Sequence, residues 1–216
     1  MTFAREGWPF VLPFFVLGLV LALAHQQGWA IASTVLGIAV LLFFRNPDRH
    51  FEGPGSTILA PADGLITLVE QVEEPSVGPG TFHHIVTFLS VFDVHVQRVP
   101  IRGRVVASAL TRGRKVAAFR PDAGVVNEQH LAVLELAGGE RVGIKQIAGL
   151  FARRVVCYLN EGDEVERGEL MGVIKFGSRV DLYVPARYRV LVAKGDRVKN
   201  GSTAMAALTH ASQPNP

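Results

Sequence analysis

The residue whose setting most directly suggests chemistry is Ser178, which follows Gly177 between two apolar runs. A glycine–serine pair between strands is most often a turn, because glycine adopts backbone angles that other residues avoid. The functional alternative is that Ser178 is a nucleophile and that Gly177 leaves its own carbonyl open to close approach. No histidine lies within seven residues of Ser178. A base that activates this serine must therefore come from elsewhere in the chain.

Histidines are the natural candidates for that base, although a lone histidine on a strand is usually structural. The chain has seven: His25, His50, His83, His84, His95, His130 and His210. His95 differs from the others because the valines of its segment, 94–99, occupy the opposite face of the predicted strand. An acid that orients its imidazole would be Asp93, two residues away on the same face, or Asp63 in a predicted turn.

A metal site is the alternative use of histidines and carboxylates. It requires ligands that converge on one ion and leave an open position. His83 and His84 are adjacent on a predicted strand and therefore point to opposite faces, so we predict no catalytic metal. The one cysteine, Cys157, excludes an internal disulfide and a cysteine cluster. Its apolar neighbours indicate a buried strand thiol.

Positive charge is concentrated in one segment of the chain. Between Asp93 and Asp122 there is no acidic residue, whereas seven basic residues occur: Arg98, Arg102, Arg104, Arg112, Arg114, Lys115 and Arg120. This pattern is either an ordinary solvated face or a surface that meets anionic lipid headgroups. No helix-turn-helix, zinc-finger or aromatic RNA-binding signature favours nucleic acid as the partner.

The elements that position these residues begin with two uncharged apolar runs, 9–24 and 29–44, joined by a short polar link. Each run is slightly shorter than the roughly 20 residues of a perpendicular membrane-spanning helix. A secretory signal would have one such run and a cleavage site. We therefore predict a transmembrane helical hairpin over residues 1–45.

The flanking residues predict how this hairpin lies in the membrane. Trp8 and Trp29 stand at run ends, where interfacial aromatic residues are expected. Arg5 precedes the first run, and Arg45 and Arg49 follow the second. By the positive-inside rule both ends face the cytoplasm. The rest of the protein would then be held on the cytoplasmic side of the inner membrane.

The remainder of the chain predicts a β domain. Residues 46–57 form a linker rich in proline and glycine, and 58–216 alternate as strands and turns. Residues 162–168 and 195–201 both read G-D-x-V-x-x-G. These copies are similar to the paired turns of a lipoyl- or biotinyl-carrier domain. The predicted fold is mainly β, a barrel-sandwich preceded by the membrane hairpin.

Several of these segments together resemble the phosphatidylserine decarboxylase family. They are Phe88–Pro100, the turn 61–64, Gln146–Gly149 with Ala152–Arg154, and 162–185, which contains the Gly177–Ser178 pair. The resemblance covers nearly the whole chain and is closest to the short, two-helix-anchored bacterial and archaeal type. Gln97 stands where the family more often carries asparagine, and we assign it no role.

The resemblance implies that the chain is a proenzyme that cuts itself between Gly177 and Ser178. His95, oriented by Asp63, would remove the proton from Ser178 Oγ, which then attacks the Gly177 carbonyl. Elimination and loss of ammonia would convert Ser178 into a covalent pyruvoyl group. The products would be a β subunit, residues 1–177, and an α subunit, residues 178–216, held together by shared strands.

The resemblance also implies the reaction. The pyruvoyl carbonyl would form a Schiff base with the serine headgroup of phosphatidylserine and accept electrons as carbon dioxide leaves, giving phosphatidylethanolamine. His95 would return a proton as general acid. The hairpin and the basic segment would hold the enzyme at an anionic bilayer, where a homodimer is plausible.

Two other classes of protein remain open at this level. A lipoyl-type carrier would show a lysine at a hairpin tip, and Lys175 is nearby but adjoins the Gly–Ser pair. A membrane-anchored serine hydrolase would use Ser178, His95 and Asp63 but keep its serine and remain one chain. Subunit size and the new end group separate the three classes.

Overall fold

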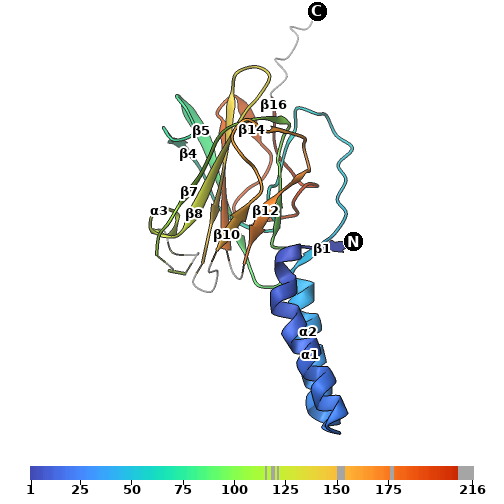
Figure 1. Cartoon of the computed structure of the whole chain (residues 1–216). Coiled ribbons are helices and arrows are strands. Elements are labelled where there is room, and N and C mark those ends of the chain that lie inside the picture. Colours follow the sequence, from blue (N-terminus) through green and yellow to red (C-terminus); the bar gives the residue numbers. More distant parts are fainter. Residues whose placement is uncertain (115, 118–119, 121, 150–153, 176–177, 209–216) are drawn as a thin grey trace, which may run out of the picture.

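The computed structural model describes residues 1–208 except 115, 118–119, 121, 150–153 and 176–177. Its first part is helical: a 3₁₀ turn, η1 (Arg5–Gly7), leads into α1 (Trp8–Leu23), and α2 (Gln27–Phe43) returns beside it. Figure 1 shows the two helices side by side, projecting from one end of a β domain. The strands β1 (Thr2–Phe3) and β2 (Arg45–Asn46) pair antiparallel at their base.

Small residues allow the two helices to approach closely. A Cβ on Gly18 would lie 2.8 Å from Thr34 Oγ1, and Ser33 Oγ donates a hydrogen bond to the carbonyl of Phe14 at 2.7 Å. Segment Arg5–Leu23 is long and apolar enough to cross a bilayer and is 17% buried, whereas Gln27–Phe43 is apolar but shorter. The predicted apolar helices are therefore present, and one of them meets the length for a span.

The β domain is built around one curled, eight-stranded antiparallel sheet with the order β11-β7-β8-β9-β13-β5-β4-β15. Its strands are β4 (Gly64–Glu73), β5 (Thr81–Leu89), β7 (Gly103–Thr111), β8 (Gln129–Glu135), β9 (Arg141–Ile147), β11 (Glu164–Val165), β13 (Ser178–Pro185) and β15 (Arg197–Val198). This confirms the prediction of a mainly β fold. The finer likeness to a carrier-type barrel-sandwich stays a prediction.

Two three-stranded sheets and one short helix complete the domain. One sheet has the order β10-β12-β6, and the other β14-β16-β3. The elements are β3 (Ile58–Leu59), β6 (Val96–Arg98), β10 (Val155–Cys157), β12 (Leu170–Ile174), β14 (Tyr188–Val190), β16 (Ala204–Leu208) and α3 (Ala123–Val126). The main core gathers apolar side chains from all three sheets, among them Ile58, Leu89, Met171, Val180, Leu182 and Met205.

The two G-D-x-V-x-x-G segments occupy opposite edges of the large sheet. β11 pairs with β7 at one edge, and β15 pairs with β4 at the other. All four glycines of the repeat have positive φ angles of 63° to 101°, a region that favours glycine. The central valines, Val165 and Val198, are 4% and 3% exposed. The predicted turns, and the valines that fill the core beside them, are confirmed.

Candidate functional site

Ser178 is the first residue of β13 and pairs opposite Leu89 of β5. Because strand residues alternate, it faces the core together with Val180 and Leu182. It has no exposed surface, and its Oγ has no hydrogen-bond partner within the described part of the chain. The predicted nucleophile is therefore a buried hydroxyl in a strand. Gly177, the other half of the predicted cleavage site, lies outside the described residues.

His95 immediately precedes β6 and is completely buried. Its Nδ1 lies 3.0 Å from the carbonyl oxygen of Asp93. Because a carbonyl only accepts hydrogen bonds, Nδ1 carries the proton and Nε2 presents its lone pair. The ring of Phe43 packs on the imidazole with 3.9 Å between centroids. Burial lowers the pKa of His95 to about 4, so at neutral pH the ring is uncharged, as a base must be.

The chain brings His95 close to Ser178 through strand β12. The backbone N–H of Ile174, the last residue of β12, donates to the carbonyl of His95 at 3.2 Å. Only four positions separate Ile174 from Ser178, and even an extended chain spans at most about 14 Å over that distance. This connection limits how far Ser178 can lie from the histidine strand, and direct contact of its side chain with His95 stays a prediction.

Asp63 is linked to strand β6, and both of its carboxylate oxygens accept hydrogen bonds. Oδ2 accepts from Arg49 Nη2 at 2.9 Å, and Oδ1 accepts from the backbone N–H of Asn200 at 2.7 Å. Asn200 Nδ2 in turn donates to the carbonyl of Val96, the residue after His95. Burial raises the pKa of Asp63, although Asn200 and Arg49 oppose that shift.

These contacts bear on the residue that orients His95. The described hydrogen bond of its Nδ1–H is donated to the main-chain carbonyl of Asp93. The Asp93 carboxylate instead accepts from the N–H and Oγ of Ser90 at 2.8 and 2.6 Å. Sequence reasoning considered only side-chain acids and so missed the main-chain carbonyl. Orientation of His95 by Asp63 stays a prediction, and the structure adds Asn200 as a link between Asp63 and the histidine strand.

Arg49 and Asn200 were not predicted as part of the site. Arg49 was interpreted only as a topology marker, and Asn200 lies in the second repeat, where the first has Arg167. This difference between the two repeats is the sequence signal that could have pointed to Asn200. It falls on Asn200, whose backbone N–H donates to Asp63 and whose side-chain amide donates to the carbonyl of Val96.

A second cluster of charged side chains lies on the face of β13 opposite to that of Ser178, and it includes Arg179 and Asp181. Arg179 binds the Asp181 carboxylate with two hydrogen bonds, at 2.5 and 2.7 Å. His84 contacts Asp181 at 2.9 Å through Nε2 and Glu70 at 3.0 Å through Nδ1. Burial opposes a charge on His84, but the Asp181 and Glu70 carboxylates outweigh it and raise its pKa. The cluster fixes the residue next to Ser178.

His83 and Asn127 both make hydrogen bonds to the main chain. His83 Nε2 lies 3.2 Å from the carbonyl of Ala186. Asn127 bonds both the N–H and the carbonyl of Val116 and also the carbonyl of Ala148. These contacts join loops to the sheet and support the structural interpretation.

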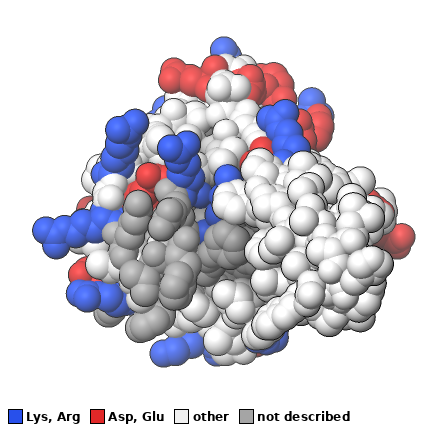
Figure 2. All heavy atoms as spheres, turned by 60° about the horizontal axis from the view of Figure 1, so that its bottom comes forward, with Lys and Arg blue, Asp and Glu red and all other residues white. Residues whose placement is uncertain are grey.

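The end of the domain that carries the site lies against the helices. Arg45 Nη2, just after α2, donates to the carbonyl of Phe92 at 2.7 Å, and Lys175 Nζ lies 5.0 Å from the ring centre of Phe10 in α1. Figure 2 shows this end, with the apolar helices beside a surface that carries several lysine and arginine side chains. The loop before His95 and the segment before Ser178 therefore both meet the helical part.

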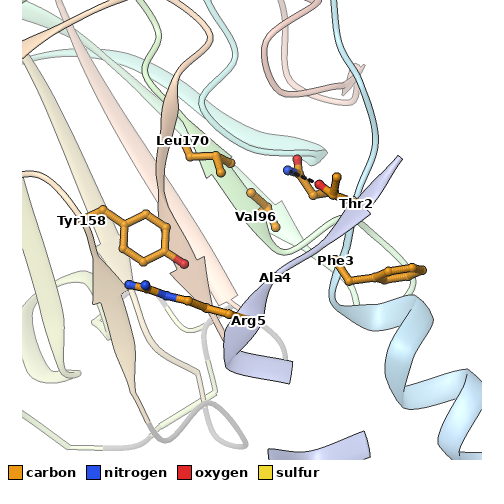
Figure 3. Close-up of a pocket in the computed structure, with 8 residues that line it drawn as sticks. Thr2, Phe3, Ala4, Arg5, Val96, Tyr158 and Leu170 are labelled. Carbon is orange, nitrogen blue, oxygen red and sulfur yellow. Dashed lines mark hydrogen bonds between the residues drawn. The ribbon is translucent and has the colours of Figure 1, made fainter. Parts of the chain in front are cut away.

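A pocket of about 320 Å³ lies at the base of the helices. Figure 3 shows Arg5 reaching toward Tyr158, with Val96 and Leu170 between this pair and Thr2. The Arg5 guanidinium lies 5.6 Å from the Tyr158 ring centre. Val96 faces this pocket, so the adjacent His95 points to the other face of the strand. Neither His95 nor Ser178 is among the residues that line the pocket.

Comparison with known proteins agrees with the sequence and the site. The family model described as "Phosphatidylserine decarboxylase" matches residues 36–206. Proteins named "Phosphatidylserine decarboxylase proenzyme" are similar over 95% of this chain. Those of Geobacter sp. (strain M21) and Aromatoleum aromaticum are 41% and 42% identical, over 96% and 95% of their own lengths. That of Symbiobacterium thermophilum is 40% identical over 95% of its length.

The family model begins within α2 and covers the β domain, including the strand after His95 and the strand that begins at Ser178. Identity of about 40% over 95% of both chains shows membership of one family as well as a shared fold. The chain therefore belongs to the phosphatidylserine decarboxylase family and is a decarboxylase of the proenzyme type.

Proposed function

We propose that this protein cuts itself between Gly177 and Ser178 and then converts phosphatidylserine to phosphatidylethanolamine and carbon dioxide at the inner membrane. The observation that carries the proposal is the buried Ser178 Oγ, which lacks a hydrogen-bond partner among the described residues. Ser178 also follows by four positions Ile174, whose N–H binds the carbonyl of His95. A structural serine in a core normally bonds a neighbouring carbonyl. A buried hydroxyl with no such bond supports a role in a reaction.

The cleavage uses only the chain's own groups. His95 Nε2 accepts the proton of Ser178 Oγ, and Oγ attacks the carbonyl carbon of Gly177. The C–N bond breaks, the nitrogen of residue 178 takes a proton, and an ester replaces the peptide bond. Loss of the Cα proton of residue 178 then expels the Gly177 carboxylate. Water replaces the nitrogen, which leaves as ammonia, and a pyruvoyl group remains at position 178.

The surroundings of Ser178 fit a pyruvoyl group. The conversion removes the hydroxyl, and because that hydroxyl has no partner among the described residues, no hydrogen bond is lost there. The ladder from Ser178 to β5 holds the backbone of the new chain end. In the reaction this group supplies a carbonyl that withdraws electrons as carbon dioxide leaves.

His95 is the residue proposed to handle protons in both stages. Its lowered pKa keeps the ring neutral and able to accept the serine proton. Once protonated in that buried setting, it is a strong acid that readily gives its proton up again. It is therefore suited to protonate the substrate carbon after decarboxylation, a type of step typically worth about 10²–10⁴-fold in rate. Asp63, linked to the histidine strand through Asn200, is proposed to support the protonated ring.

The membrane arrangement is proposed from the helices and their flanks. The segment Arg5–Leu23 has the length of a span, and the paired helix α2 would complete a hairpin with both ends in the cytoplasm. The site end of the β domain lies against these helices and carries basic side chains, which favour an anionic bilayer. Lipid tails could then stay in the bilayer while the headgroup reaches position 178. Association as a homodimer is part of the proposal.

The direct test is release of labelled carbon dioxide from vesicles of phosphatidylserine that carries the label on the serine carboxyl carbon. The wild-type protein should release label and form phosphatidylethanolamine, whereas Ser178→Ala, which cannot form the pyruvoyl group, should release none. Arg187→Ala, at an exposed ion pair with Glu140, is a control that should keep activity. Label release by folded Ser178→Ala would contradict the proposal.

A further inference from the structure

The two residues proposed to react belong to different sheets. His95 precedes β6 in the sheet β10-β12-β6, whereas Ser178 begins β13 in the eight-stranded sheet. A nucleophile and its base must be held within a few tenths of an ångström to react well, and misplacement by 1 Å can cost about 100-fold in rate. Some contact must therefore fix one sheet against the other at this point.

Two buried glutamines make such a contact. Gln97 Nε2 donates to the carbonyl of His95 at 2.7 Å, and Gln146 Nε2 donates to Gln97 Oε1 at 2.9 Å. Neither glutamine has any exposed surface. Gln97 lies on β6, and Gln146 lies on β9, opposite Val180 and hence two residues along β13 from Ser178. The pair joins the backbone of the base to the sheet of the nucleophile.

The partners fix the orientation of both amides. The carbonyl of His95 can only accept, so Gln97 must present its NH₂ group there and its Oε1 to Gln146. Gln146 must then present Nε2, which leaves its Oε1 without a partner among the described residues.

The backbone beside the bridge is shaped to admit it. Gly172 of β12 pairs opposite Gln97. A Cβ at Gly172 would lie 2.9 Å from Gln146 Nε2 and 2.1 Å from the carbonyl oxygen of Val156. Glycine therefore leaves the space through which the Gln146 amide reaches β6. The His95 carbonyl meets a second donor, the N–H of Ile174, on the same strand β12.

We propose that Gln97 and Gln146 are positioning residues that align His95 with residue 178 across the two sheets. The inference rests on the proposed function, because it assigns the bridge a role in self-cleavage and in turnover. A merely structural bridge would lower thermal stability when removed but leave both rates unchanged in the folded protein.

The test compares Gln97→Met, Gln146→Met and the double variant with wild type, in the full-length protein in detergent. Methionine keeps the length of glutamine without its hydrogen bonds. Each single variant should slow self-cleavage and lower kcat by about 10–100-fold, with KM changed less than about twofold. Because both changes break one bridge, the double variant should be no slower than the worse single variant.

A matched control removes another internal hydrogen bond. Ser108 Oγ donates to the carbonyl of Leu159 at 2.6 Å, so Ser108→Ala should lower the thermal midpoint while keeping both rates. Glutamine variants that fold, cut and turn over like wild type would overturn the inference. A wild-type protein that never cuts would instead overturn the proposed function, so the two failures are distinguishable.

Gln146→Glu keeps the inference testable where the methionine variants do not fold. A protonated glutamate can donate to Gln97 Oε1, as the amide does, but an ionised one cannot. Self-cleavage of Gln146→Glu should therefore decline with rising pH relative to wild type, and Gln97→Met/Gln146→Glu should lose that pH dependence. A pH profile for Gln146→Glu with the wild-type shape would contradict the bridge.

Discussion

At the scale of single residues, the two buried histidines of this region differ in how burial affects their charge. Burial keeps His95 neutral, whereas neighbouring carboxylates stabilise the proton on His84. His95 is buried against Phe43, with a pKa lowered to about 4, whereas His84 is held between two carboxylates and has a raised pKa. These opposite shifts suit opposite tasks: His95 is proposed as a neutral base, and His84 pairs with the carboxylates of the cluster that holds Arg179. Both shifts have consequences for stability that can be measured.

The first prediction concerns the protein below neutral pH. An unfolded histidine binds a proton near pH 6.5, whereas folded His95 does so only near pH 4. In that window the unfolded chain binds more protons, so the free energy of unfolding falls as pH falls. His95→Gln should remove about 2 kcal/mol of the loss between pH 7 and pH 5. Urea unfolding at both pH values, with His50→Gln as control, measures the difference; an equal loss in wild type and His95→Gln would contradict it.

The second prediction has the opposite sign. His84 gains its proton more readily in the folded state than in the unfolded state. Its contribution to the free energy of unfolding is therefore fully present below pH 6.5 and is lost as pH rises through the raised pKa. His84→Gln should therefore destabilise the protein more at pH 6 than at pH 9. Thermal unfolding at both pH values tests this, with His83→Gln, whose ring contacts only the carbonyl of Ala186 in the described contacts, as the control. A destabilisation that is the same at both pH values would show that the pairing is not ionic.

At the scale of elements, hydropathy and turn chemistry predicted most of what the structure shows. The uncharged runs 9–24 and 29–44 correspond to α1 and α2 within one or two residues. The repeat glycines adopt the expected positive φ angles. Ser178, however, is in strand β13, so the interpretation of this serine as an ordinary turn residue is wrong.

The contacts within the site could not be predicted, because they join residues far apart in the sequence or use the main chain. Asp63 meets Arg49 and Asn200, 14 and 137 positions away. Gln97, to which no role was assigned, meets Gln146 from 49 positions away. The partner of His95 Nδ1 is a carbonyl, which every residue carries and no motif marks. The periodicity of a sequence identifies the face of a strand on which a residue lies, but it does not identify the element that packs against that face.

The third prediction tests the close approach beside the glutamines. Gly172→Ala would place a Cβ against the carbonyl of Val156 and the amide of Gln146. We expect a destabilisation of about 1–3 kcal/mol and slower self-cleavage, because a backbone shift here displaces β6 and His95. Gly138→Ala, where no atom lies within 4 Å of the new Cβ, is the control for thermal unfolding and cleavage. If both variants behaved alike, the space at Gly172 would have no special role.

At the scale of the whole molecule, the site is placed where the β domain meets the helices. The loop before His95 ends in two exposed apolar residues, Val91 and Phe92, 51% and 83% exposed. Its Phe92 carbonyl is bound by Arg45 at the end of α2. A protein held by these helices would thus bring an apolar loop and the reacting residues to the bilayer surface together.

The fourth prediction follows from that loop. Phe92→Ser should raise KM for phosphatidylserine in vesicles by about tenfold or more, because a buried aromatic ring contributes about 1.5–3 kcal/mol to partitioning and 1.4 kcal/mol is about tenfold. Turnover of a dispersed short-chain phosphatidylserine should be unchanged. Leu191→Ser, at a 40% exposed apolar residue after β14, is the control and should leave both unchanged. Loss of turnover on both substrates would mean that Phe92 acts on His95 instead of on the membrane.

The most direct test of the central claim is the intact mass of the purified protein under denaturing conditions. The account predicts two chains divided at Gly177–Ser178, the smaller one blocked and lighter than a serine-started peptide by the change from amine to ketone. His95→Ala should give one uncut chain. A single full-length mass for the wild-type protein, or a small chain that begins with an unmodified serine, would contradict the account and favour the hydrolase or carrier alternatives.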